Sequence, residues 1–189
     1  MNDVAVPPPS ASVLRDVLRE VSITHVVGLP DNASAPIFEL LSRNTHPALL
    51  PVTREGESFA IASGMWIGGA RPAILIQNTG LLESGDALRG TATRMRVPLL
   101  CLITMRGFAK MEAAGDEAKL LPNGWDARTL ARPDLDSVAP MTEPTLHAWG
   151  VPSARYGSDS DAVVLVEAVR RSEEERRPMA VLLTRGLTS

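Results

Sequence analysis

Two short, almost uninterrupted apolar runs, "PAILIQN" (72–78) and "VPLLCLITM" (97–105), constrain the possible folds of this chain most strongly. A strand with one face in water alternates apolar and polar residues, whereas a strand that is apolar throughout is typical of a parallel sheet covered on both faces. Helices must then pack on either side of that sheet. The two runs therefore predict an α/β protein with a mostly parallel sheet.

The rest of the chain supplies the helices and strands that this fold needs. Helical spacing of apolar residues is found in five further segments: 10–21, 36–43, 55–69, 81–94 and 160–177, and helical patterns also run through 125–149. Shorter β-rich runs lie at 23–30, 48–53, 151–156 and 178–186. Because 189 residues suit one sizeable domain, we expect a single three-layer domain over 11–189, after a flexible Pro-rich leader over 1–10.

Composition excludes several classes of function. A net charge of −3 argues against nucleic-acid binding, which depends on clustered Lys and Arg. The N-terminal segment lacks the pattern of a secretory signal, and no apolar run approaches a membrane span, so we expect a cytoplasmic protein. Cys101, the single cysteine, is expected to be a buried apolar side chain.

The common motifs of nucleotide-binding and hydrolytic enzymes are missing from this sequence. It has no phosphate-binding loop, no G-x-G-x-x-G after the first strand and no G-x-S-x-G turn. His25, His46 and His147 are far apart and lack the spacing of metal ligands, so we expect them to be structural or exposed, and no metal site in this chain.

Polar residues that follow the strands are the remaining candidates, because ligands bind at the carboxyl ends of parallel strands. These ends are "GLPDN" (28–32), "VTREGE" (52–57), "QNTGLLES" (77–84) and "MRGFAK" (105–110). Glu55 is the best-placed carboxylate, and small residues such as Gly64 follow it, which lets a ligand or another backbone approach. The same pattern also fits purely structural roles: a favourable helix-dipole interaction for the acid, and tight packing on the sheet for the small residues.

Three segments resemble the pyrimidine-binding (PYR) domain of thiamine-diphosphate-dependent enzymes: "GLPDNASAPIFELL" (28–41), "VTREGESFAIASGMWIGGARPAILIQNTGLLESGDAL" (52–88) and "RVPLLCLITMRG" (96–107). Within this family the resemblance is greatest to the α subunit of sulfopyruvate decarboxylase and to phosphonopyruvate decarboxylase, and it covers nearly the whole chain. A glutamate of the family, followed nine positions later by glycine, matches Glu55 and Gly64. The motif Gln-Asn-Ser-Gly-Leu-Gly-Asn matches residues 77–83.

The resemblance implies an α subunit of a two-subunit 2-oxo-acid decarboxylase that depends on thiamine diphosphate. In these enzymes a carboxylate bonded to ring N1′ favours the imino tautomer, whose 4′ nitrogen takes the C2 proton of the cofactor. Glu55 would be that carboxylate, whereas Glu57 is expected only to stabilise the helix start. The other residues implied to line the cofactor are Asn78, Thr79, Gly80 and Leu81. Those implied to face the substrate are Asp31, Asn32, Arg106 and Lys110, under a lid formed by residues 106–124.

The resemblance also implies a partner. Enzymes of this family hold the diphosphate through Mg²⁺ on a second domain that carries Gly-Asp-Gly and a later Asn, and this sequence has no such motif. We therefore expect a separate diphosphate-binding (PP-domain) β subunit, an active site between the chains and a hetero-oligomer built on α₂β₂ pairs.

Three residues depart from the family pattern: Leu82 replaces Gly, Glu83 replaces Asn, and Asp86 stands where Asn is frequent. Two added acids would repel a dianionic sulfonate or phosphonate unless they point away, so the sequence leaves the 2-oxo acid open. A carboligase subunit with the same machinery is one alternative. A non-catalytic regulatory or binding subunit that retains the fold is another, although the intact Glu55 argues against it.

Overall fold

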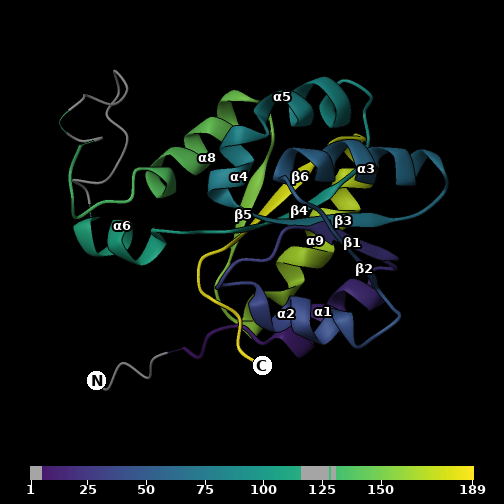
Figure 1. The fold of residues 1–189 in the computed structure, drawn as a ribbon, viewed down its shortest axis with the longest axis horizontal. Coiled ribbons are helices and arrows are strands. Elements are labelled where there is room, and N and C mark those ends of the chain that lie inside the picture. Colours follow the sequence, from purple (N-terminus) through teal and green to yellow (C-terminus); the bar gives the residue numbers. More distant parts are fainter. Residues whose placement is uncertain (1–5, 116–127, 129–130) are drawn as a thin grey trace.

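A six-stranded parallel sheet forms the centre of the computed structural model, which describes residues 6–115, 128 and 131–189 (Figure 1). The strand order is β2-β1-β3-β4-β6-β5, and every neighbouring pair is parallel. The strands are β1 (His25–Gly28), β2 (Ala48–Pro51), β3 (Pro72–Gln77), β4 (Leu100–Thr104), β5 (Ser153–Tyr156) and β6 (Met179–Leu183). The predicted α/β class with a parallel sheet is confirmed.

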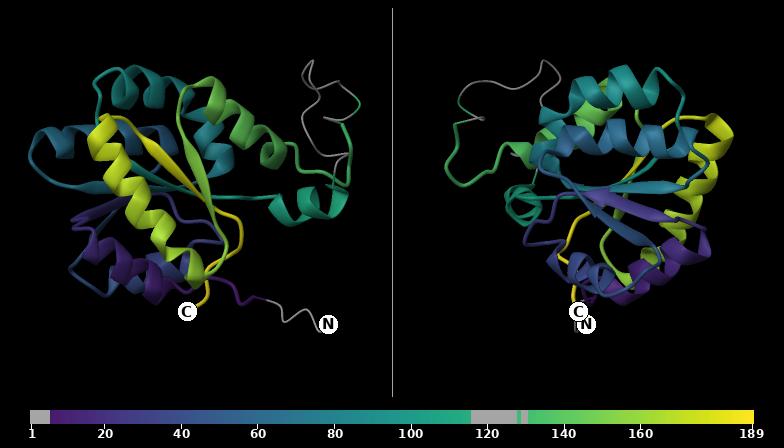
Figure 2. Two further views of the ribbon diagram at one scale, coloured as in Figure 1. Left: turned by 180° about the vertical axis from the view of Figure 1, so that it is seen from behind. Right: turned by 45° about the vertical axis from the view of Figure 1, so that its right-hand side comes forward.

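Helices cover both faces of the sheet, as the two views of Figure 2 show. One face carries α1 (Ala11–Glu20), α2 (Ala35–Ser42) and α9 (Ala162–Glu175). The other face carries α3 (Glu55–Ile67), α4 (Asn78–Glu83), α5 (Gly85–Ala87), the π-helical turn η1 (Leu88–Thr93) and α8 (Val138–Ala148). Two further pieces complete the described chain: α6 (Phe108–Ala114) after β4, and the short 3₁₀ helix η3 (Asp159–Asp161) before α9.

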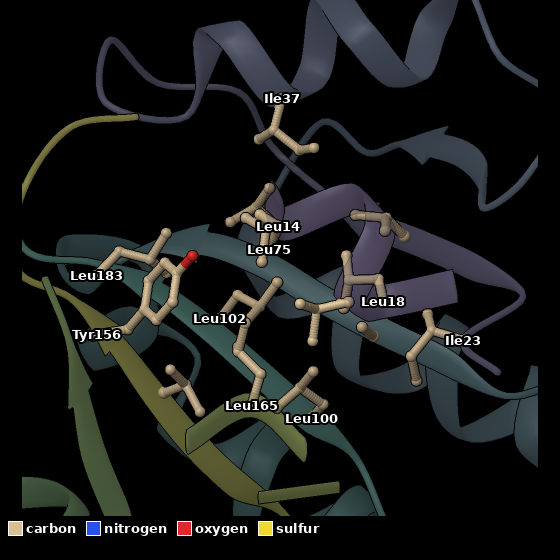
Figure 3. Packing of buried hydrophobic residues seen from close by; sticks show 14 of the residues in the cluster. Leu14, Leu18, Ile23, Ile37, Leu75, Leu100, Leu102, Tyr156, Leu165 and Leu183 are labelled. Carbon is tan, nitrogen blue, oxygen red and sulfur yellow. The ribbon is translucent and has the colours of Figure 1, made fainter. Parts of the chain in front are cut away.

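Side chains of the central strands alternate between two hydrophobic cores. In β4, Leu100 and Leu102 point into the core beneath α1, α2 and α9, whereas Cys101 and Ile103 point into the core beneath α3 and α8. Figure 3 shows the first core, where the strand leucines meet apolar side chains of the helices, including Leu14, Leu18, Ile37 and Leu165. Because both faces are covered, the central strands β3, β4 and β6 are apolar at nearly every position.

Cys101 is a fully buried free thiol in the second core. Burial raises the pKa of its thiol to about 12, so the thiolate that reacts with electrophiles is suppressed. The prediction of a buried, unreactive cysteine is confirmed.

The residues ahead of α1 lie against the C-terminal segment. The Pro9 carbonyl accepts a hydrogen bond from the Thr188 amide (2.9 Å), and the Ala11 amide donates to the Thr188 carbonyl (2.8 Å). The Ser10 hydroxyl caps α1 by accepting from the Val13 amide (3.1 Å). The last residues of the segment expected to be a leader are thus attached to the domain, and residues 1–5 lie outside the described part.

Two predicted segments differ from the structure. The helix expected over 81–94 begins at Asn78, because Gln77, the last residue of β3, is itself the N-cap of α4. The lid expected over 106–124 contains the helix α6, and its residues 116–124 lie outside the described part. Within 125–149 the described helix is α8, which contains Pro144.

Candidate active site

The segments that follow β1, β3, β4 and β6 meet at one edge of the sheet because the strands are parallel. They place polar side chains side by side: Asp31 after β1, Gln77 at the end of β3, and Arg106 after β4. The segment after β6 adds Thr184 and Arg185. This edge is the candidate active site.

Asp31 is the centre of a hydrogen-bond network that joins the ends of three strands. Its Oδ1 accepts from the amide and the hydroxyl of Ser34, each at 2.7 Å. Its Oδ2 accepts from Nε2 of Gln77 (3.0 Å) and from the hydroxyl of Thr104. Burial alone would raise the pKa of this carboxyl, but the hydrogen bonds from Thr104, Ser34 and Gln77 outweigh it, so the pKa is lowered from 3.8. Asp31 is therefore an ionised acceptor near neutral pH.

Two adjoining hollows open beside this network. The first, of about 350 Å³, is lined by Asp31 and by the exposed Asn32, together with Gln77, Thr184 and both Arg106 and Arg185. The second, of about 620 Å³, shares Arg106 and Arg185 and adds Lys110 and Asp136. The four residues implied to face the substrate thus line these adjoining hollows: Asp31 and Asn32 the first, Lys110 the second, and Arg106 both. Arg106 is held in place by Asp136, whose Oδ2 accepts from its Nε at 2.8 Å.

Glu55 is the first residue of α3, and its half-buried side chain lies on the backbone of α4. A Cβ added to Gly80 would be 2.2 Å from both Cγ and Cδ of Glu55, so only glycine at position 80 leaves room for this arrangement. Within the described part of the chain, no hydrogen bond or ion pair engages the Glu55 carboxylate. A proton acceptor without a hydrogen-bond partner among the described residues therefore lies at the junction of α3 and α4, within the electrostatic influence of Arg54.

Glu57, two residues further on, has a different role. Its carboxylate accepts from the amides of Thr53 (3.1 Å) and Arg54 (3.2 Å) and closes a capping box at the start of α3. The hydrogen bonds from these amides lower the pKa of the Glu57 carboxyl. Glu57 stabilises the helix start, as predicted.

Residues 78–81 form the first turn of α4, and the side chains of Asn78, Thr79 and Leu81 are all engaged inside the chain. Asn78 is fully buried, and its Nδ2 donates to the Arg106 carbonyl (3.1 Å), which ties the end of β3 to the end of β4. Leu81 packs in the second core. The Thr79 hydroxyl donates to Oε1 of Gln77 (2.7 Å) and so extends the network around Asp31. The side chains of Asn78 and Leu81 are therefore engaged inside the chain, and the cofactor contacts that the resemblance implies for these residues stay a prediction.

The two acids that depart from the family pattern turn away from the hollows. Glu83 pairs with the guanidinium of Arg54, and Asp86 pairs with Arg89 at 2.5 Å. Neither acid lines either hollow. The expected repulsion of a dianionic substrate by Glu83 and Asp86 therefore does not apply to the space between Arg106 and Arg185.

Sequence reasoning missed Arg185 and Thr184 because it considered four strand ends and left out the one after β6. A signal was available: "PMAVLLTRG" (178–186) reads as a buried strand of the same parallel sheet, so its polar end belongs at the same edge. The partners of Asp31 were missed as well, because Gln77 and Thr104 lie on strands with no sequence link to it.

The described residues contain neither a metal-binding cluster nor a membrane-spanning helix. No group of three or more His, Cys, Asp or Glu side chains there has the arrangement needed to hold a metal ion. Among the described helices, none has the length and apolar character needed to cross a membrane.

Comparison with known proteins identifies two kinds of relative. Phosphonopyruvate decarboxylase from Streptomyces hygroscopicus is 32% identical over 98 residues, which make up 52% of this chain and 24% of that protein. Sulfopyruvate decarboxylase subunit alpha from Methanococcus maripaludis is 26% identical over 134 residues, 70% of this chain and 77% of that subunit. The corresponding subunit from Methanocaldococcus jannaschii is 26% identical over 128 residues, 67% of this chain and 73% of that subunit.

These relatives differ in how much of their length is matched. The match spans about a quarter of the phosphonopyruvate decarboxylase but about three quarters of each alpha subunit. No family model matches the chain. The resemblance to sulfopyruvate and phosphonopyruvate decarboxylases inferred from the sequence is confirmed.

Proposed function

We propose that this chain, a homologue of sulfopyruvate decarboxylase alpha subunits and of phosphonopyruvate decarboxylases, is the α subunit of a two-subunit 2-oxo-acid decarboxylase that uses thiamine diphosphate. The observation that carries this proposal is the unpartnered carboxylate of Glu55, held against Gly80. It stands where the family resemblance puts the acid that activates the cofactor.

The surroundings of Glu55 fit an aminopyrimidine ring. Its carboxylate accepts no hydrogen bond from the described residues, and the absence of a side chain at Gly80 leaves room for it at the junction of α3 and α4. When bound, thiamine diphosphate supplies a carbon nucleophile for the keto group and an electron sink for the departing CO₂. Glu55 would hold a proton at ring N1′ through a charge-assisted hydrogen bond.

The substrate side of the proposed site is the edge that carries Asp31 and Arg106. Arg106, anchored through Nε by Asp136, presents the rest of its guanidinium to an anionic group of the 2-oxo acid. Asp31 holds the strand ends in register through its hydrogen bonds. Because those bonds keep it ionised, we assign it a positioning role instead of proton donation near neutral pH.

A second subunit completes the site in this proposal. The name "subunit alpha" of two relatives implies that their enzymes contain at least one further subunit. The sequence of this chain contains no Gly-Asp-Gly motif for a diphosphate-bound Mg²⁺. We therefore assign the diphosphate and Mg²⁺ to a separate β subunit.

Reconstitution tests the proposal. The chain is co-purified with a candidate partner that carries the Gly-Asp-Gly motif, and CO₂ release is measured from sulfopyruvate, phosphonopyruvate and pyruvate. We expect release only when both chains, thiamine diphosphate and Mg²⁺ are all present. Release by this chain alone would contradict the two-subunit assignment, and its absence from the complete mixture with every 2-oxo acid would favour a non-catalytic subunit. Analysis of the products distinguishes simple decarboxylation, which yields an aldehyde, from carboligation, which yields a longer carbon chain.

A further inference from the structure

Three cationic side chains line the larger hollow at the carboxyl ends of β4 and β6. They are Arg106, Lys110 and Arg185, and Asp136 is the one acid among the described residues that line the same space. These three cations and one acid give the described lining of the larger hollow a net charge of +2, whereas the adjoining hollow, which shares Arg106 and Arg185, also contains the ionised Asp31. A hollow of this charge favours a ligand with two negative charges.

The positive charge of this cluster is only partly neutralised. Arg106 uses Nε for Asp136, and its two terminal nitrogens have no partner among the described residues. Arg185 donates to the backbone carbonyl of Val6, which is a neutral acceptor. Lys110 forms no ion pair within the described part of the chain, although its charge interacts with the carboxylate of Asp134. The two guanidinium groups thus keep donors and charge for a ligand.

We propose that Arg185, together with Arg106, binds the second anionic group of a dianionic 2-oxo acid, a sulfonate or a phosphonate, and so selects the substrate class. This inference rests on the proposed function. Guanidinium groups match oxyanions of this kind because their N–H donors lie in a fixed plane. Lys110 adds charge at the rim.

The chemistry of decarboxylation favours the second anionic group over the carboxylate as the ligand of this pair. The carboxylate loses its charge as CO₂ departs, so a strong ion pair with it would stabilise the ground state against the transition state. The sulfonate or phosphonate keeps its charge throughout. Binding it lowers the free energies of the ground state and the transition state equally, so the effect belongs in KM and not in kcat.

Ligand binding by the full chain tests this inference without catalysis. The probes are 3-sulfopropanoate and 3-phosphonopropanoate, which lack the keto group, and butyrate, which lacks the second anionic group. Calorimetry should show binding of one or both dianions, weakened by salt, and none of butyrate. Comparing the two dianions identifies the preferred head group. We expect Arg185→Gln to weaken binding roughly 10- to 100-fold, and Arg185→Lys to weaken it less.

A matched control separates this effect from general loss of charge. Arg89 is also exposed, but it pairs with Asp86 away from both hollows, so Arg89→Gln should leave binding of the dianions unchanged. The thermal midpoint of Arg185→Gln is measured alongside, because Arg185 also contacts Val6. Equal binding of the dianion by the wild type and a folded Arg185→Gln, or equal binding of butyrate and the dianions by the wild type, would overturn the inference.

Kinetics of the reconstituted enzyme separate this inference from the proposed function. With sulfopyruvate or phosphonopyruvate, Arg185→Gln should raise KM roughly 10-fold or more with little change in kcat, and with pyruvate it should change neither. CO₂ release with an unchanged KM for these substrates would refute the role of Arg185 and leave the decarboxylase intact. If binding of the dianions depends on Arg185 but no 2-oxo acid releases CO₂, the anion-binding role of Arg185 is supported and the proposed decarboxylase function is refuted.

Discussion

The side chain of Glu55 lies directly on the Cα atom of Gly80, where an added Cβ would be 2.2 Å from its Cγ and Cδ. The two residues belong to α3 and α4, which follow β2 and β3. These strands flank β1 in the sheet order β2-β1-β3, so the crossover of the chain brings two helix starts together. One start carries an acid and the other a glycine, and the acid can occupy its position only because residue 80 has no side chain.

Replacing Gly80 with alanine tests whether this contact positions the acid. Real Cβ atoms do not approach other atoms to 2.2 Å, so the Glu55 side chain must move. Because that side chain is flexible, we expect little change in the thermal midpoint but a kcat of the reconstituted enzyme lower by roughly 10- to 100-fold. Undiminished kcat in the alanine variant would show that the contact does not matter.

Gly64→Ala is the matched control for that variant. The space around Gly64 is open, since an added Cβ would meet nothing within 4 Å. Alanine in the exposed interior of a helix should therefore raise the free energy of unfolding of the isolated chain by about 0.5–1 kcal/mol. Glycine-to-alanine substitution is thus expected to lower kcat at position 80 and to raise the free energy of unfolding at position 64.

Glu55→Gln separates proton handling from packing. The amide keeps the size of the side chain but cannot carry the negative charge that holds a proton at a ring nitrogen, so we expect kcat to fall roughly 100- to 10,000-fold. Co-purification with the partner should be unaffected. Turnover equal to the wild type would sink the proton-relay role.

Glu57→Gln provides the comparison two residues away. It weakens the capping box on the amides of Thr53 and Arg54, so a small fall in the thermal midpoint of the chain is expected. kcat of the reconstituted enzyme should stay at the wild-type level. A large loss of kcat in this variant would show that the start of α3, and not the carboxylate of Glu55 in particular, controls activity.

Asp31 should make the stability of the chain depend on pH in the acid range. Its native pKa is lowered from 3.8, so its contribution is fully present above about pH 4 and is lost as the pH falls through the native value. Asp31→Asn should remove this dependence. At pH 7 we expect the variant to lose roughly 1–3 kcal/mol, because donors of Gln77 and Thr104 lose an ionised acceptor.

Denaturant titrations between pH 3 and pH 7 measure this effect. Asp86→Asn serves as control, since Asp86 is an exposed acid whose partner is Arg89. If the wild type and Asp31→Asn lose stability in parallel between pH 5 and pH 3, other carboxylates account for the acid sensitivity.

Cys101 should react with thiol reagents only when the domain opens. Its pKa of about 12 and its full burial suppress both the thiolate and access to it. With a disulfide reagent at pH 8, we expect negligible labelling of the native chain and one equivalent after addition of denaturant. Rapid labelling of the native chain would mean that the core between β4 and α8 opens readily.

The sheet and the position of Glu55 at a helix start were predictable because they rest on local patterns. Apolar runs such as 72–78 leave only a strand covered on both faces, and Glu55 directly follows a β-rich run, as it follows β2 in the structure. The catalytic role of Glu55 came from the family resemblance and stays a prediction. The helix starts were less predictable. Residues 77–79 look like the end of a strand and a turn, whereas Gln77 ends β3 and caps α4 at the same time.

The side-chain partners could not be predicted because they depend on strand order. Asp31 is far in sequence from Thr104, and only the parallel arrangement brings their side chains into contact. The directions of Glu83 and Asp86 likewise depend on Arg54 and Arg89, which draw them away from the hollows. Arg185 required knowledge that β6 lies next to β4.

The alternation of β4 between the two cores limits how this site can evolve. A residue inserted within the strand would exchange the faces of Leu102 and Ile103 and shift Arg106 by about 3.3 Å relative to its neighbours. Lineages can therefore change the chemistry at this edge by substituting side chains or by lengthening the segments beyond the strands, but not by lengthening the strands. Packing of the strands in the two cores therefore fixes the strand lengths, and with them the positions of the polar residues that follow the strands.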